Sequence, residues 1–222
     1  VLIERTVPHS IMVNRKGERF CNEAANYSAL AGAFHQFGPQ SYDYPNLPAW
    51  LMFDDDYVER DPIGLRLAGR PVRDGVMRAD SLGELAAQTG VPAEALSATV
   101  QRFNGFANTG EDLDFKRGTS AYDHFYGDRS REGTAVTLGE VARGPFYAVE
   151  IRMGLLGTNG GARTDGAARI LGHDGDPIAG LYGAGNAIAC PTGGIYAGAG
   201  GTLGPALTFG YIAGRTAARA NA

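Results

Sequence analysis

The sequence predicts an α+β fold, and three observations lead to this class. A strand-like run lies near the start, at residues 10–23, and two stretches with helical periodicity follow within residues 81–110. Glycine and alanine then dominate from residue 154 onward. Hydrophobic residues make up 44% of the 222 residues, which is enough for a packed core. We therefore expect a mixed α+β unit over the first part of the chain.

The first expected element is a β-hairpin over residues 10–23. The apolar residues 11–13 and the segment 19–21 flank a polar turn from Asn14 to Gly17, where glycine can adopt a positive φ. Residues 38–76 are rich in proline, aspartate, glycine and tyrosine, so they are predicted to be mostly irregular, with a short strand from Ala49 to Phe53.

Two helices are predicted between residues 81 and 110. Ser81 and Glu84 have the spacing of a capping box, and Gly90 marks the end of the first helix. The second helix has Pro92 near its start and Gly110 beyond its end. Its apolar face consists of Leu96, Val100 and Phe103. Residues 145–153 then alternate like a strand.

The change of composition predicts a domain boundary near residue 157. Short strands are expected at residues 167–171 and 181–184, and a final helix from about Pro205 to Ala220. About 65 residues of this composition bury too little apolar surface to be stable alone. We therefore expect this second part to complete a sheet that is supplied elsewhere.

Composition also excludes several classes of function. The net charge is −4 and the basic residues are scattered, so no nucleic-acid partner is expected. Cys21 and Cys190 form no CxxC pair and the four histidines lack metal-ligand spacing, so neither a disulfide framework nor a metal site is expected. The chain begins at Val1 without a signal pattern and is interpreted as a piece of something longer.

Residues 187–214 are the most distinctive segment, because they contain no charged residue and no histidine. Their many glycines and two prolines argue against a transmembrane span. A glycine-rich loop that leads into a helix near Pro205 is the better interpretation, since the free N–H groups of a helix start can stabilise negative charge. An ordinary glycine-rich connection is the structural alternative. The pair Gly183 and Gly185 resembles the opening of a dinucleotide fingerprint, but no helix follows it, so a complete Rossmann unit is rejected.

Several motifs together resemble the succinate dehydrogenase/fumarate reductase flavoprotein superfamily. They are Glu4-Arg5, the segment 10–23, residues 144–147, residues 156–165 and residues 180–186. Residues 194–211, with the sequence GIYAGAGGTLGPALTFGY, are most similar to the 3-ketosteroid Δ1-dehydrogenases. The resemblance covers nearly the whole chain.

The resemblance implies the fold and the cofactor. Residues 1–157 would be the substrate (cap) domain, and residues 158–222 would be the C-terminal return segment of a glutathione-reductase-like FAD-binding α/β domain. FAD would be the cofactor of the whole enzyme, with weak or absent binding by this piece alone, because the family's GxGxxG half is missing. A steroid ketone and an external electron acceptor would be the partners, and a cytoplasmic location is expected.

The resemblance also implies roles for individual residues. The Tyr196 hydroxyl and the Gly200 N–H would hold the C3 carbonyl oxygen and stabilise an enolate. Tyr27 would take the C2 proton, for which its ordinary pKa of about 10 must be lowered or the proton relayed. The N–H groups of Leu203 and Gly204 would face the pyrimidine end of the flavin, and Asn186 would approach its ribityl or pyrophosphate region. Gly185 and Gly201 complete the implied cofactor-binding set.

Three alternatives remain open from the residues. A dicarboxylate reductase of the same superfamily would need arginine and histidine at the flavin, which residues 187–214 lack. A Δ4-specific ketosteroid dehydrogenase would differ only in regiochemistry. A non-catalytic module that binds a steroid or a protein partner is favoured by the missing fingerprint.

Overall fold

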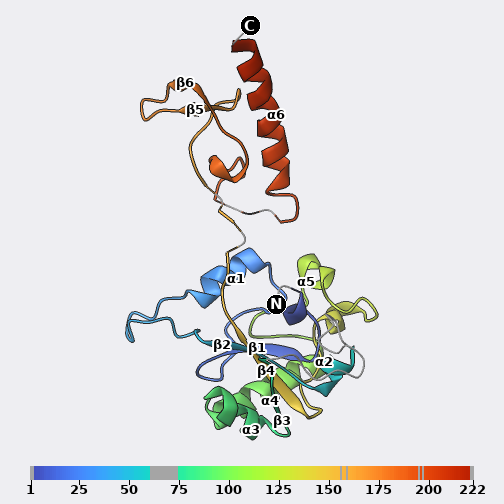
Figure 1. Cartoon of the computed structure of the whole chain (residues 1–222). Coiled ribbons are helices and arrows are strands. Elements are labelled where there is room, and N and C mark those ends of the chain that lie inside the picture. Colours follow the sequence, from blue (N-terminus) through green and yellow to red (C-terminus); the bar gives the residue numbers. More distant parts are fainter. Residues whose placement is uncertain are drawn as a thin grey trace. The chain divides into compact units, whose positions relative to one another are not determined.

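The structure of the chain is a computed structural model that describes residues 3–60, 75–155, 157–158, 160–194, 196 and 198–220. The chain divides into two compact units, Val1–Met153 and Gly154–Ala222. Helices and strands occur in both units (Figure 1), so the predicted α+β class is confirmed.

The first unit is built on a four-stranded antiparallel sheet with the strand order β1-β2-β4-β3. Its elements in chain order are η1 (Glu4–Thr6), β1 (Ser10–Asn14), α1 (Tyr27–Phe34), β2 (Ala49–Phe53), α2 (Asp55–Arg60), β3 (Met77–Ala79), α3 (Leu82–Thr89), α4 (Ala93–Thr109), α5 (Ala121–Phe125), η2 (Gly133–Val136) and β4 (Phe146–Ile151).

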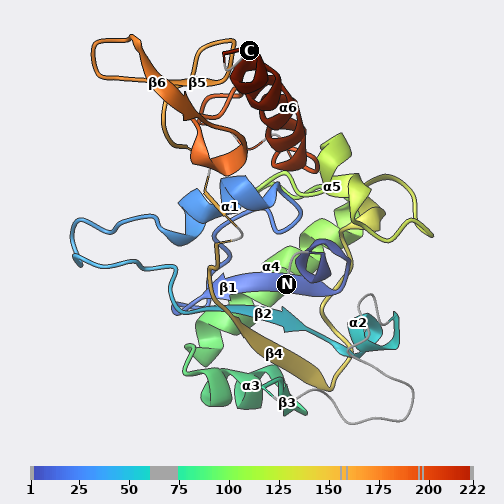
Figure 2. The same ribbon diagram turned by 45° about the horizontal axis from the view of Figure 1, so that its top comes forward.

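Helices cover both faces of this sheet, which explains why every residue of β1 and β2 is buried. Successive side chains of a strand point to opposite faces. Trp50 and Met52 of β2 accordingly join the core under α3 and α4, whereas Leu51 and Phe53 join the core under α1 and α2. Figure 2 shows α1 and the α3–α4 pair on opposite sides of the sheet. The uninterrupted apolar run of β2 is therefore that of a central strand.

The predicted helices at residues 81–110 are confirmed with their caps. The Ser81 hydroxyl accepts from the Glu84 N–H at 3.2 Å and opens α3, and Gly90 ends it with φ 74°. Pro92 precedes α4, and Gly110 ends it, also at φ 74°. The predicted face of α4 is its buried face, with Leu96, Val100 and Phe103 in the core.

The predicted hairpin over residues 10–23 is wrong in its second arm. The two arms are joined by a hydrogen bond from the Asn14 N–H to the Glu18 carbonyl (2.9 Å) and by an isolated bridge between Val13 and Arg19, whereas β1 forms its ladder with β2. Beyond Arg19 the chain leaves the sheet, and the Arg19 side chain forms buried ion pairs with Glu23 and Asp112. The strand at Ala49–Phe53 is confirmed, while part of the segment 38–76, residues 61–74, lies outside the described residues.

The second unit contains β5 (Arg169–Leu171), β6 (Pro177–Tyr182), η3 (Gly185–Ala187) and α6 (Leu203–Ala220). Helix α6 begins two residues before the predicted start at Pro205. Among the described residues of this unit, only Ala168 and Ile188 are buried. Leu203, Leu207 and Tyr211 lie at helical spacing on α6 and are all more than half exposed. Within the described residues, no helix has the length and apolar character needed to cross a membrane.

Candidate substrate and flavin site

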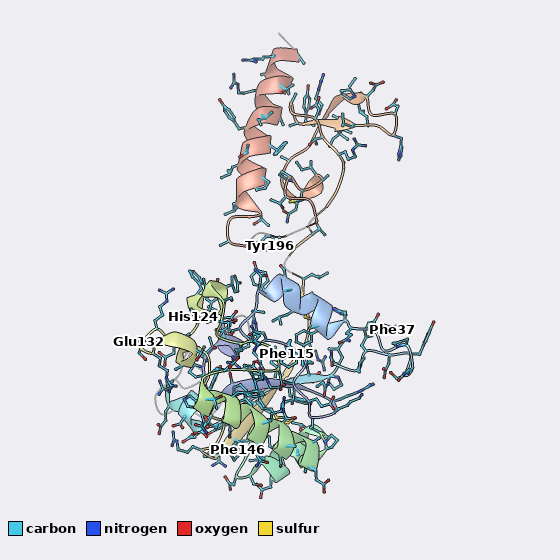
Figure 3. The ribbon with its side chains drawn as sticks, turned by 180° about the vertical axis from the view of Figure 1, so that it is seen from behind. Phe37, Phe115, His124, Glu132, Phe146 and Tyr196 are labelled. Atoms are coloured by element: carbon cyan, nitrogen blue, oxygen red, sulfur yellow. The ribbon has the colours of Figure 1, made fainter. Side chains whose placement is uncertain are left out.

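A glycine turn between Tyr196 and α6 forms the centre of the candidate site (Figure 3). Gly198 and Gly200 have φ values of 113° and 88°, which side-chain-bearing residues rarely adopt. The Gly201 N–H donates to the Gly198 carbonyl at 3.0 Å and so closes the turn. The motif therefore needs its glycines for backbone conformation before any ligand is considered.

The aromatic ring of Tyr196 lies against Gly201. A Cβ atom at residue 201 would be 2.9 Å from Cε2 of Tyr196, which is closer than real Cβ contacts come. Tyr196 itself is half-buried and has interactions within the structure. Gly201 thus provides the space that the Tyr196 ring occupies. The resemblance gave Gly201 a cofactor contact, and its place in the structure adds this second role.

The start of α6 differs in detail from the expected arrangement of N–H donors. The Gly204 N–H donates to the Gly200 carbonyl at 2.8 Å and is thereby used within the turn. The N–H groups of Leu203 and Gly200 donate to none of the residues that the structure describes. A helix start with such donors and without a competing charged side chain suits the anionic end of a flavin or an enolate oxygen.

Gly185 and Asn186 lie in η3, which follows β6 and packs against the first turn of α6. Gly185 has φ 64°, and a Cβ there would lie 3.3 Å from the Cβ of Ala206 in α6. The side-chain nitrogen of Asn186 would be 3.0 Å from a Cβ at Gly157, and the Ala162 N–H donates to the Ala187 carbonyl at 3.2 Å, so Gly157 and Ala162 lie beside η3. These two predicted cofactor residues therefore sit next to the α6 start, within the second unit.

Tyr27 is the first residue of α1 in the first unit. Asn26 caps this helix, with its side-chain oxygen accepting from the Ser28 N–H at 2.8 Å. Tyr27 is half-buried and interacts with other parts of the structure. Tyr27 therefore begins a helix whose Leu30 and Phe34 are buried in the core of the first unit.

A buried charge cluster holds the segment before Tyr27, and no motif in the sequence indicates it. Its members are Arg19, Glu23, Asp112 and Arg117. Arg19 donates to Glu23 through Nε (2.8 Å) and Nη2 (2.7 Å), and also to both carboxylate oxygens of Asp112 (3.1 and 2.9 Å). Arg117 is fully buried and reaches Glu23 at 3.2 Å. Two arginines and two carboxylates are thus joined by ion pairs in the order Arg117, Glu23, Arg19, Asp112.

The cluster controls the ionisation of its acids. Burial by itself favours the neutral form of Glu23, but Arg19 and Arg117 outweigh it and hold the pKa of this carboxyl below its ordinary value. The pKa of Asp112 is lowered in the same way, with burial opposed by hydrogen bonds and charge from Arg19. Cys21 beside the cluster has a raised thiol pKa, because burial disfavours the thiolate. Both carboxylates are therefore ionised near neutral pH.

Among the described residues, His9, Asp54 and Asp56 form a group whose potential metal-ligand atoms lie within 4.8 Å of one another. His9 Nδ1 contacts the Glu140 carbonyl at 2.7 Å, and Nε2 lies 2.9 Å from an Arg131 guanidinium nitrogen. Both ring nitrogens are thus engaged, one of them by a cationic group. These two contacts of His9 link the start of β1 to Arg131 and Glu140, so they explain the histidine as a structural residue.

Comparison with known proteins places the chain in a family. Residues 1–203 match the family described as FAD binding domain. The chain is 51% identical over 215 residues to 4-oxocyclohexanecarboxylate 2-dehydrogenase of Sinomonas cyclohexanicum, covering 97% of this chain and 38% of the relative. It is 46% identical over 223 residues to 3-oxosteroid 1-dehydrogenase of Mycolicibacterium smegmatis, covering 96% of this chain and 38% of the relative.

Solved structures agree with the sequence relatives. The 3-ketosteroid delta1-dehydrogenase from Sterolibacterium denitrificans, in complex with 1,4-androstadiene-3,17-dione, matches with a TM-score of 0.88 and 38% identity, over 99% of this chain and 40% of that one. A flavocytochrome c3 fumarate reductase in its open conformation matches with a TM-score of 0.63 and 26% identity, over 99% and 34%. The chain spans well under half the length of these relatives. The chain belongs to the FAD binding domain family, and the resemblance to 3-ketosteroid Δ1-dehydrogenases that its motifs indicate is confirmed.

Proposed function

We propose that this chain is the substrate domain and the flavin-domain return segment of a FAD-dependent 3-ketosteroid Δ1-dehydrogenase. The observation that carries the proposal is the turn at residues 198–201 before α6, where the Tyr196 ring lies against Gly201 and the N–H groups of Gly200 and Leu203 lie at the helix start. In this proposal residues 1–157 bind the steroid, and residues 158–222 complete the flavin domain. Leu203, Leu207 and Tyr211 form an exposed apolar stripe on α6, as expected if other residues cover this helix in the whole protein.

The Tyr196 hydroxyl and the Gly200 N–H have the chemistry to hold a ketone oxygen. Both are hydrogen-bond donors, and Gly200 offers no side chain that could keep a substrate away from its backbone. Donors placed at a carbonyl oxygen stabilise the negative charge that develops when the neighbouring carbon loses a proton. The uncharged surroundings in residues 187–214 keep these hydrogen bonds strong, because they lack competing ions.

Tyr27 is proposed to take the proton from C2 of the steroid A ring. When bound, FAD supplies the acceptor for the hydride that leaves C1, and an external acceptor later removes the two electrons. Loss of one proton and one hydride from adjacent carbons leaves the C1–C2 double bond. The N–H of Leu203 at the α6 start and the neighbouring Gly185 and Asn186 would hold the flavin.

A second candidate reaction is the dehydrogenation of a cyclohexanone carboxylate. The relative with 51% identity, whose name describes a 4-oxocyclohexanecarboxylate 2-dehydrogenase, favours it. Both reactions remove hydrogen beside a ring ketone, so the same Tyr196 and Gly200 pair would serve either substrate. They differ in the need for a cation to bind a carboxylate, and residues 187–214 provide none.

The test is an activity assay of the whole protein with a redox dye as electron acceptor. Two substrates, 4-androstene-3,17-dione and 4-oxocyclohexanecarboxylate, are compared in parallel. We expect conversion of the steroid to 1,4-androstadiene-3,17-dione with the larger kcat/KM. A larger kcat/KM for the carboxylate would replace the steroid proposal by the second candidate. Turnover of neither ketone by flavin-loaded protein would overturn both and favour a non-catalytic binding module.

A further inference from the structure

The segment that leads into Tyr27 is held by the side chain of Arg5. This guanidinium donates through Nη1 to the Ala25 carbonyl at 2.9 Å and to the Glu23 carbonyl. Arg5 is 4% exposed, so these hydrogen bonds lie in the interior. Two carbonyl groups of the three residues 23–25 are thus bound to one side chain that lies about twenty positions earlier in the chain.

Beside its local hydrogen bonds, the segment has further contacts from distant parts of the first unit. The Glu23 carboxylate accepts from the Met12 N–H of β1 at 3.1 Å, and the Asn22 amide donates to the buried Asp123 at 3.0 Å. Arg117 donates to the Val7 carbonyl at 2.8 Å and reaches the Arg5 carbonyl at 3.5 Å. Arg117 therefore fixes the backbone that carries Arg5, and Arg5 fixes the backbone that leads to Tyr27.

Arg5 differs from the arginines of the buried charge cluster in its partners. Arg19 and Arg117 face Glu23 and Asp112 as ion pairs, whereas among the described residues Arg5 pairs with carbonyl oxygens and with no carboxylate. Burial accordingly lowers the pKa of the Arg5 guanidinium. Desolvation of a buried cation is costly, and among the described residues no carboxylate forms an ion pair with Arg5 that would offset this cost. Its hydrogen bonds do specify one conformation of residues 23–25.

We propose that Arg5 is a positioning residue for Tyr27. By binding the carbonyls of Glu23 and Ala25 it fixes the point and the direction in which α1 begins, and so the location of the first side chain of that helix. The proposal rests on the proposed function, in which Tyr27 takes the substrate proton. A base displaced by about 1 Å loses rate far more than affinity, which makes the idea measurable.

Arg5→Met is the most direct variant, because it leaves Arg19, Arg117, Glu23 and Asp112 matched in charge. Arg5→Lys keeps a cationic donor and serves as the conservative replacement. The matched control is Leu96→Ala, which removes a fully buried side chain from the α4 core on the opposite face of the sheet. That control lowers stability without touching residues 23–27.

The experiment measures, in the whole protein, exchange of C2 deuterium from the ketone, ketone Kd, melting temperature, and amide exchange of residues 22–30. For Arg5→Met we expect at least a tenfold slower C2 exchange, a Kd within threefold of the parent, and faster amide exchange confined to residues 22–30. Arg5→Lys should recover most of the rate, and Leu96→Ala should keep the parental rate despite its lower melting temperature.

Two results would overturn the role of Arg5. One is a parental C2 exchange rate in Arg5→Met. The other is a loss of C2 exchange rate no larger than that of Leu96→Ala, when each variant is assayed at the same number of degrees below its own melting temperature. If Arg5→Met does not fold, Arg5→Lys is the deciding variant. A twofold to fivefold slower C2 exchange together with faster amide exchange at residues 22–30 supports the positioning role, and parental values of both contradict it.

Tyr27→Phe in the same series separates the positioning role of Arg5 from the proposed function. If it exchanges C2 deuterium at the parental rate, the proposed function fails at Tyr27, whereas its inactivity beside an unaffected Arg5→Met refutes only the positioning role.

Discussion

The ring of Tyr196 occupies the space that a side chain at Gly201 would need, with Cε2 only 2.9 Å from the position of a Cβ atom there. The same Cβ atom would also lie 3.0 Å from the Gly198 carbonyl oxygen, so Gly201→Ala must displace the Tyr196 ring, the turn that Gly201 closes, or both. We expect at least a tenfold lower kcat in the whole protein, because the hydroxyl no longer meets the ketone oxygen. Steady-state kinetics with 4-androstene-3,17-dione measure this effect.

The matched control for this substitution is Gly214→Ala in α6. A Cβ at residue 214 meets nothing within 4 Å, and alanine is the better helix former, so we expect full activity and unchanged or slightly raised stability. Equal activity of Gly201→Ala and Gly214→Ala would show that the Tyr196 ring position does not matter for turnover.

Removal of the Tyr196 hydroxyl alone gives a second prediction. Tyr196→Phe keeps the ring against Gly201 and deletes one donor to the ketone, so kcat should fall by at least about tenfold with little change in protein stability. Pre-steady-state flavin reduction by the steroid is the suitable measurement, since it excludes the later acceptor step. Parental flavin reduction would remove Tyr196 from the chemistry.

The buried charge cluster predicts a dependence of stability on pH. Asp112 and Glu23 have lowered pKa values in the folded protein. Their stabilising effect is therefore complete above the ordinary carboxyl pKa values of about 4 and is lost as the pH falls through the lower folded values. Asp112→Asn leaves Glu23 as the one carboxylate of the cluster beside Arg19 and Arg117, so the buried cluster carries an excess positive charge and should lose about 3–5 kcal/mol of stability at pH 7.

The difference in melting temperature between Asp112→Asn and the parent should shrink steadily below about pH 4. Glu150→Gln is the control, because it also removes a carboxylate from an ion pair, but Glu150 pairs with an exposed Arg152 and adds little stability. A difference for Asp112→Asn that stays constant from pH 7 to pH 3 would contradict the ionised state of Asp112.

A further prediction concerns cofactor retention by the 222-residue chain on its own. The sequence has no GxGxxG motif, so the α6 start and η3 would have to hold FAD without a pyrophosphate-binding loop. We expect the purified polypeptide to lose FAD on gel filtration. Co-elution of FAD at one equivalent per chain would show that residues 158–222 form a sufficient flavin site.

Elements with local signals could be predicted from the sequence. Helices α3 and α4 begin and end at Ser81, Gly90, Pro92 and Gly110 because cap residues act on their immediate neighbours. The apolar run of β2 likewise marks a strand that is buried on both faces. Helix α1 was not predicted, although Asn26 is a capping residue that could have indicated its start.

Features that depend on distant contacts could not be predicted. The second arm of the predicted hairpin forms no strand, and its Arg19 is paired with Asp112, 93 positions later, a contact that no local pattern indicates. The Arg5 and Arg117 contacts span up to 112 positions, and nothing in the spacing of these arginines indicates them. In the candidate site, the motif located Tyr196 and Gly200, but only the structure reveals that Gly201 accommodates the tyrosine ring and that Gly204 has used its N–H.

The assignment of Tyr27 as the base is tested most directly by exchange of C2 deuterium from a 3-ketosteroid bound to the whole protein with Tyr27→Phe. The aromatic ring is retained, so steroid Kd should stay within tenfold of the parent. We expect C2 exchange and flavin reduction both to fall to background in this variant. Exchange and flavin reduction at the parental rate would show that Tyr27 is a packing residue and that the proton goes to another group.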